Sequence, residues 1–268
     1  MKKGLYPWRK SFGRTLPAFI LSLGFLASSA VSPQAATKKT PVRVLLITGG
    51  HAYHTNLFLQ MFHSFRGIQV RHVEHPNNVY QWWTPEKRDS WDVLVLYDLW
   101  QKIPDEAKTN LIDCLHSGKG LVILHHAMAN YQDWPEYERI MGGRYFLRPT
   151  KRNGKVYPRS TWKHGVDIQV HVVNPRHPIT RGMKDYTIHD EIYGLVLIHP
   201  DVQPLLTTKT PGSLPILAWI SPYKPARVVV IQSGHDEHAW NNPNFRKVLR
   251  RSILWVAHRI GVRQRPRN

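Results

Sequence analysis

Short apolar runs alternate with segments of helical periodicity through the first half of the chain. The runs at 42–47, 68–73, 93–97 and 121–125 are almost continuously apolar. Strands that are covered on both faces of a sheet show this pattern. We therefore predict four buried β-strands in this part of the chain.

Helical patterns occupy two of the intervals between these runs, around 56–65 and at 105–117. The second pattern begins after Pro104, ends before Gly118 and places its apolar residues on one face. Strand, helix and strand in succession form right-handed crossovers between parallel strands. The pattern therefore predicts an α/β protein with a mostly parallel sheet.

From residue 127 onward the periodicity weakens, and we expect long loops with one short helix at 135–141. Further strands are predicted at 167–173, 202–206, 214–220 and 228–232. The turn 222–225 has a proline at each end, so it predicts that the last two strands form an antiparallel hairpin. We place this hairpin at the edge of the sheet.

The last helix has the clearest pattern of the chain. Asn242 can cap its first turn, Pro243 fits its first position, and apolar residues recur at helical spacing from Phe245 to Ile260. The opposite face carries Arg246, Lys247, Arg250 and Arg251. We expect that face to lie in solvent.

The first 30 residues differ from the rest and have the order of a secretory signal. A basic start is followed by the apolar run 18–27 and by the small residues 28–30. The apolar run is about half of the roughly 20 residues that a membrane helix needs, and an uncleaved anchor is the alternative. We predict a signal peptide at 1–30, a flexible segment at 31–41, a domain at 42–262, and a periplasmic or extracellular location.

The chain is strongly basic, with a formal charge of +19. The predicted signal carries five basic residues and no acidic one, so about +14 remains without it. These charges are scattered and no nucleic-acid-binding motif accompanies them. We expect no specific nucleic-acid partner, because net charge informs about nonspecific contacts more than about function.

Cys114 is the only cysteine, so the chain cannot form an intrachain disulfide. It falls near the apolar face of the predicted helix 105–117. We expect a buried core residue rather than a nucleophile.

Histidines follow three of the predicted strands. Ligands bind beyond the carboxyl ends of strands in an open parallel sheet, so these residues are expected to share a cleft. They are His51 and His54 after the first strand, His125 and His126 after the fourth, and His235 and His238 after the last.

Asp190 and Glu191 add two adjacent carboxyl groups in a chain that has few acids. Burial would raise the pKa of such a carboxyl group and nearby histidine cations would lower it. We name Glu191, Asp190, His125 and His235 as candidate catalytic residues for acid–base chemistry. Trp240 is a candidate for stacking on a sugar.

A metal site is an open alternative for the same histidines. His54, His125 and His235 with a carboxylate would suit a divalent ion such as zinc. The spacing does not decide this, because no H-x-x-x-H pair or cysteine pair is present. Other site types fit less well, since Gly49-Gly50 matches no nucleotide-binding loop and His125 stands where a nucleophile elbow would place serine or cysteine.

Several motifs in this order resemble the trehalose utilisation (ThuA-like) family, over about residues 42–260. They are VLLITGGHAYH, GKGLVILHHA, WPEYERIMGGRY, HPITRGM, HDEIYG and SGHDEHAW. The resemblance implies a flavodoxin-like, class I glutamine amidotransferase-like three-layer sandwich that lacks the amidotransferase cysteine. It also implies a polar cleft that holds His54, His125, Asp190, Glu191, Tyr193 and His235, with His54 and Tyr193 binding substrate.

The residues and the resemblance together predict an exported protein of carbohydrate metabolism. Its partner would be a small carbohydrate, a disaccharide or keto-sugar, which it would process as a hydrolase, lyase or isomerase without a cysteine nucleophile. The alternatives are a noncatalytic carbohydrate-binding protein on the same fold and a basic protein that binds nucleic acid or a surface. Loss of turnover without loss of stability on mutation of His125 and His235 would distinguish an enzyme.

Overall fold

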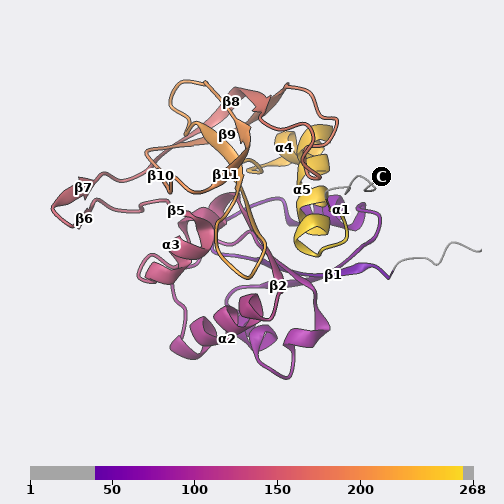
Figure 1. The fold of residues 1–268 in the computed structure, drawn as a ribbon. Coiled ribbons are helices and arrows are strands. Elements are labelled where there is room, and N and C mark those ends of the chain that lie inside the picture. Colours follow the sequence, from indigo (N-terminus) through magenta and orange to yellow (C-terminus); the bar gives the residue numbers. More distant parts are fainter. Residues whose placement is uncertain (1–39, 262–268) are drawn as a thin grey trace, which may run out of the picture. The chain divides into compact units, whose positions relative to one another are not determined.

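The computed structural model describes residues 40–261. Its centre is a nine-stranded sheet in the order β2-β1-β3-β4-β13-β12-β11-β8-β9 (Figure 1). The predicted signal at 1–30 and most of the segment 31–41 lie outside the described residues. The strands are, in chain order, β1 (Val42–Thr48), β2 (Ile68–Glu74), β3 (Val93–Leu96), β4 (Gly120–Leu124), β8 (Thr161–Val172), β9 (Tyr186–Gly194), β11 (Gln203–Thr207), β12 (Ile216–Ile220) and β13 (Val228–Ile231).

Five strands from β2 to β13 pair in parallel, which confirms the predicted parallel core. The four strands from β12 to β9 continue the sheet in antiparallel order. The β12–β13 hairpin is antiparallel as predicted, but its placement at the edge was wrong. All four residues of β13 are buried, because β4 pairs with one side of the strand and helices cover both of its faces.

Helices cover the sheet on both faces, which confirms the three-layer sandwich. Helices α1, α4 and α5 pack with one buried cluster, and α2 and α3 pack with the other (Figure 1). Their bounds are α1 (Thr55–His63), α2 (Asp105–His116), α3 (Pro135–Met141), α4 (Glu237–Asn241) and α5 (Pro243–Val256), with 3₁₀ turns η1 (Val79–Trp83), η2 (Arg88–Ser90) and η3 (His125–Ala129). No helix among residues 40–261 is both long and apolar enough to cross a membrane.

The predicted cap and apolar face of α5 are confirmed. The Asn242 side chain accepts from the backbone N–H groups of Asn244 and Phe245, which satisfies two donors that the first helical turn leaves unpaired. The basic face is less open to solvent than predicted. Arg250 donates to the carbonyl of Arg66, and Arg246 and Arg251 also hydrogen bond to neighbouring segments.

Cys114 is fully buried in α2, as predicted. Burial raises the pKa of its thiol to about 11. The group is therefore a thiol and not a thiolate at neutral pH, so it is unreactive as a nucleophile.

A long two-stranded ribbon, β8 with β9, joins the sheet only at one end. Leu206 and Thr207 of β11 pair with Val172 and His171 of β8, while β8 and β9 pair along most of their length. Sequence analysis began β8 six residues too late and did not predict β9, because the first half of β8 is exposed and lacks an apolar pattern. The short strands β5 (Gly143–Arg144) and β10 (Leu197–Ile198) pair beside this ribbon, and β6 (Thr150–Arg152) with β7 (Lys155–Tyr157) forms a projecting hairpin (Figure 1).

Candidate active site

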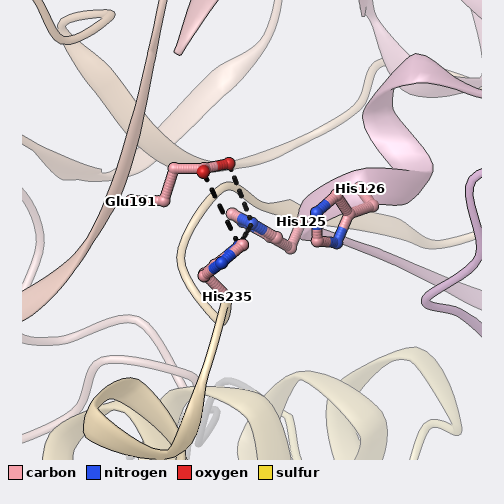
Figure 2. Close-up of side chains that lie close together, drawn as sticks. All are labelled: His125, His126, Glu191 and His235. Atoms are coloured by element: carbon pink, nitrogen blue, oxygen red, sulfur yellow. Dashed lines mark hydrogen bonds and ion pairs between the residues drawn. The ribbon is translucent and has the colours of Figure 1, made fainter. Parts of the chain in front are cut away.

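Four side chains from three separate segments of the chain meet in one cluster (Figure 2). His125 and His126 follow β4, His235 follows β13, and Glu191 comes from β9. One nitrogen or oxygen atom of each lies within 4.8 Å of the corresponding atoms of the other three. The expectation that histidines after β4 and β13 would share a cleft with Glu191 therefore agrees with the geometry.

The alternation of β9 decides which side chains face this cluster. Glu191 and Tyr193 lie two residues apart, so they point to the same side of the strand. A bulge in β8 lies opposite Glu191, because the register shifts between Lys163 and Val166. Bulges redirect side chains beside functional sites, and this one brings His164 to the same pocket as Glu191.

Asp190 faces the other way and lies outside the pocket. Its carboxylate accepts the backbone N–H groups of Gly234 and His235 at 2.7 and 3.0 Å, and that of Glu191 at 2.8 Å. The side chain is fully buried, and burial raises its pKa although His125 and these hydrogen bonds oppose the shift. Asp190 thus holds the loop that carries His235 and does not face a ligand.

His125 lies behind the pocket and connects its walls. Its Nδ1–H donates to the carbonyl oxygen of Gln232 at 2.5 Å, because a carbonyl can only accept. That bond directs Nε2 toward the cluster, 3.1 Å from Nδ1 of His235, 3.1 Å from the Tyr193 hydroxyl and 3.5 Å from Glu191 Oε1. His125 also has a φ of 50°, a conformation that residues with a Cβ rarely adopt and that recurs at functional sites.

His126 and His51 form a second layer of imidazoles. Their ring centroids lie 4.0 Å apart, and His51 Nε2 donates to the carbonyl of Tyr97 at 2.7 Å. Nδ1 of His126 is buried without a hydrogen-bond partner among the residues that the structure describes. Burial lowers the pKa of His126 far below its usual value, and the charge of His125 adds to this. His126 is therefore a neutral ring with an available lone pair.

The pKa values of the pocket groups leave an anionic acid beside neutral rings. Burial raises the pKa of Glu191, but the hydrogen bond and charge of His125 and the charge of His235 outweigh it, so the pKa lies below its usual value. Burial lowers the pKa of His235, with His125 adding to the shift. Burial raises the pKa of Tyr193, and Glu191 reinforces this. At neutral pH the pocket thus holds a carboxylate, an uncharged imidazole and an intact phenol.

These groups line a pocket of about 430 Å³, a size within the usual range for small-molecule sites. Glu191, Tyr193, His126 and His235 form its polar part. The rest of the lining was not predicted, because all of these residues except Leu99 come from a stretch without periodicity. They are Leu99, Ala129, Tyr145, Leu147, Arg159, Trp162 and His164.

The structure does not bring His54 or Trp240 to this pocket. The His54 side chain is 66% exposed and lies 3.0 Å from Glu237. Trp240 is 2% exposed and donates from Nε1 to the carbonyl of Gly234 within the core. Trp162, which is 59% exposed in the pocket wall, is the residue that is placed to stack on a ligand.

The glycines before His51 allow two loops to cross. A Cβ on Gly50 would lie 2.0 Å from the carbonyl oxygen of Leu99, and Gly49 accepts the N–H of Leu99. Gly50 also has a φ of 79°. This pair therefore serves close backbone approach and positions His51 beside His126.

Three members of the cluster, His125, His235 and Glu191, have the donor types of a zinc site and separations close to those of one. His126 belongs to the cluster only within a wider limit of 4.8 Å. Zinc binds imidazole nitrogen and carboxylate oxygen at about 2.0–2.2 Å, so tetrahedral ligand atoms lie roughly 3.3–3.5 Å apart. The His125–His235, His125–Glu191 and His235–Glu191 separations are 3.1, 3.5 and 3.7 Å. The hydrogen bond from His125 Nδ1–H to the carbonyl of Gln232 is also typical of metal-binding histidines. His126, and not His54, completes this set of four.

Solved structures share this fold. A putative ThuA-like protein from Parabacteroides merdae ATCC 43184 matches with a TM-score of 0.69 and 19% identity, over 85% of this chain and 94% of that one. One from Bacteroides uniformis ATCC 8492 matches with a TM-score of 0.63 and 16% identity, over 84% and 95%. A beta-galactosidase from Bacillus circulans sp. alkalophilus matches with a TM-score of 0.53 and 7% identity, over 80% of this chain and 31% of that one.

A comparison with curated proteins gave no match. The sequence profile of the ThuA family, which is described as trehalose utilisation, matches residues 43–256. This span is well over half of the 268 residues and contains every residue of the cluster. The chain therefore belongs to the ThuA family.

Proposed function

We propose that the protein processes a disaccharide or a keto derivative of one by acid–base chemistry in this pocket. The observation that carries the proposal is the position of Glu191 and His235, which lie 3.7 Å apart and both line the pocket. The family's description as trehalose utilisation supports a sugar as the ligand. Tyr193 and Trp162 add the mixture of hydroxyl and aromatic surface that suits a sugar.

Glu191 is the base in this mechanism. Its lowered pKa keeps it ionised at neutral pH, so it can take a proton from a substrate hydroxyl or from the carbon beside a substrate carbonyl. The Tyr193 phenol remains protonated and is placed to donate a hydrogen bond to a substrate oxygen. The proton returns to the substrate from Glu191 or through His235, which lies beside it.

His125 acts on these groups without reaching the ligand. It is fully buried and its Nε2 faces both His235 and Tyr193. We therefore regard His125 as a positioning residue in the metal-free mechanism. Its contacts fix the orientation of two side chains that line the pocket.

As an alternative to this metal-free mechanism, we propose that His125, His126, Glu191 and His235 hold a divalent ion such as zinc, in which case Glu191 and His235 would be ligands and not the proton-transfer groups. The separations of their donor atoms support this. When bound, such an ion would polarise a substrate oxygen as a Lewis acid. Tyr193 would still donate a hydrogen bond from the wall of the pocket.

We also propose that the protein acts outside the cytoplasm. The basic start, the apolar run 18–27 and the small residues after it support export. Sequencing the amino terminus of protein recovered from the periplasm or medium tests this proposal. A start at Met1 would favour the uncleaved anchor over a cleaved signal, and recovery in the cytoplasm alone would contradict the proposal.

The test of the sugar proposal is a screen for products from trehalose, related disaccharides and their keto derivatives. We expect turnover of at least one of them, and a loss of about 100-fold or more in kcat for Glu191→Gln, since acid–base groups contribute about 10²–10⁴ in rate. Binding without a product for every sugar tested would favour the noncatalytic carbohydrate-binding alternative. Absence of binding would overturn the proposal.

A further inference from the structure

The pocket is bordered by a segment that contains no acidic residue. Residues 139–166 include eight lysines and arginines and neither aspartate nor glutamate. This segment contains the β6–β7 hairpin and the first part of β8, and five of its side chains line the pocket. Those five are Tyr145, Leu147, Arg159, Trp162 and His164.

Half of these cations are paired with acids on or near α3. Arg139 pairs with Glu136, Arg144 and Arg152 with Glu138, and Arg148 with Asp133. Within residues 40–261, the other four form no ion pair. They are Lys151, Lys155, Arg159 and Lys163, and all are exposed.

Arg159 is the one of these four that lines the pocket. It lies close enough to Tyr145 to oppose, with its charge, the rise that burial causes in the pKa of that hydroxyl. Trp162 lies three residues farther along and lines the same pocket with much of its surface exposed. A cation and an aromatic surface therefore line the same pocket as Glu191.

We propose that the ligand is an acidic saccharide, with a carboxylate that pairs with Arg159 and a ring that stacks on Trp162. The proposal rests on the proposed function, which places the reacting sugar at Glu191 and His235. An arginine fork matches the two oxygens of a carboxylate. Because Glu191 is ionised, the charged end of the ligand lies toward Arg159 and its uncharged end lies toward Glu191.

Charge and shape favour a saccharide over nucleic acid as the occupant. The pocket is a concavity of about 430 Å³, which suits one or two sugar rings and not a duplex. The Glu191 carboxylate lines the pocket, and its charge would repel a second phosphate of a polynucleotide. The unpaired lysines on the β6–β7 hairpin attract the same anionic ligand over a longer distance.

The experiment compares two disaccharides that differ in one unit. This unit is glucosyl in the neutral sugar and glucuronosyl in the acidic sugar. Calorimetric titration of the full chain at low salt should show the acidic sugar binding about tenfold or more tightly, as expected for a charge-assisted hydrogen bond. Arg159→Gln should reduce that ratio to below about threefold and leave the affinity for the neutral sugar within twofold. Arg159→Lys should give an intermediate ratio, because it keeps the charge and loses the fork.

The control is Arg176→Gln, which removes an exposed arginine that does not line the pocket. It should leave both affinities unchanged. Equal affinity of the wild type for the two sugars would overturn the inference and leave the proposed function standing. Failure to bind either sugar would overturn the proposed function itself.

Two further binding measurements test whether the ligand is a different kind of anion. If a sugar phosphate binds more tightly than the glucuronosyl sugar, with the same dependence on Arg159, the anionic group of the ligand is a phosphate and not a carboxylate. Duplex DNA that displaces the acidic sugar with a steep salt dependence, and that also depends on Arg159, would overturn the saccharide as occupant. A preference for the acidic sugar that survives in Arg159→Gln would overturn the role of this residue.

Discussion

Nε2 of His125 lies 3.1 Å from Nδ1 of His235, although 110 residues separate them in the sequence. Each residue follows a strand of the parallel core, and the two strands, β4 and β13, are neighbours. The contact therefore depends on the pairing of distant parts of the chain. It also depends on Asp190, which fixes the backbone at His235 from the opposite side.

Replacing Asp190 should weaken both the fold and the site. Asp190→Asn keeps the size of the side chain but replaces one acceptor oxygen by a donor that faces backbone N–H groups. We expect the free energy of unfolding to fall by about 1–3 kcal/mol, and kcat to fall because His235 loses its fixed position. Denaturant unfolding and activity assays measure the two effects.

The control for Asp190 is Asp167→Asn on the neighbouring strand. Asp167 pairs with His189, but its side chain is 73% exposed, and exposed ion pairs contribute little. We expect a change below about 0.5 kcal/mol and no change in kcat. If the two variants lost similar amounts of stability, Asp190 would have no special role in holding the loop.

Zinc binding should distinguish His126 from His54. If the cluster holds the metal, His126→Ala and His235→Ala lose zinc, measured by elemental analysis after dialysis against a weak chelator. Zinc should also raise the melting temperature of the chelated wild type and not that of these variants. His54→Ala should keep one zinc per chain, and loss of the metal in His54→Ala and His235→Ala but not in His126→Ala would restore the ligand set first predicted.

The stability of the metal-free protein should fall as the pH drops below about 6.5. The pKa of His126 lies far below 6.5 in the folded protein and near 6.5 in the unfolded chain. The unfolded chain therefore takes up the proton first, and one such histidine contributes a slope of up to about 1.4 kcal/mol per pH unit. Denaturant unfolding at pH 7.5, 6.5 and 5.5 measures it.

His126→Gln isolates this contribution from those of other buried groups. His51 and His235 also have lowered pKa values and add slopes of the same sign, and the raised pKa of Asp190 gives a slope of opposite sign. His51, His235 and Asp190 are present in both the wild type and His126→Gln. The difference in slope between the wild type and His126→Gln should therefore report His126. An identical slope in His126→Gln would show that its lowered pKa contributes nothing.

Gly50 should tolerate no side chain. Gly50→Ala combines an unfavourable φ of 79° with a clash against the Leu99 carbonyl, and we expect a loss of about 3 kcal/mol or more. Gly118→Ala is the matched control, since its φ is 90° and no atom lies within 4 Å of the added carbon. It should lose only about 1–2 kcal/mol from backbone strain. Equal losses would show that the crossing of the two loops is not tight.

Periodicity along the chain predicted the elements that neighbouring residues determine. The parallel strands, the two-sided burial, the cap at Asn242 and the buried Cys114 all follow from local sequence. The position of β13 beside β4 does not, because no local pattern shows which distant strand a strand will pair with. The same limit explains why the β12–β13 hairpin was placed at the edge.

The candidate site was predictable at the level of strand ends but not of single side chains. Glu191 and Asp190 are adjacent, and only the assignment of β9 as a strand shows that they face opposite ways. His126 and His54 both follow strands, and their positions depend on the conformation of each loop. Arg159 and Trp162 gave no signal, because they lie in an irregular segment that only the folded chain brings to the pocket.

The β8–β9 ribbon joins the sheet through two register pairs, yet it supplies Glu191, Tyr193, Trp162 and His164 to the pocket. The histidines on the other wall belong to loops that the parallel core fixes. The two walls are thus built on different strands, and Asp190 ties the loop of His235 to the ribbon. Changes confined to exposed ribbon side chains such as Trp162 can alter which molecule the protein accepts, whereas changes at Asp190 would disturb both walls at once.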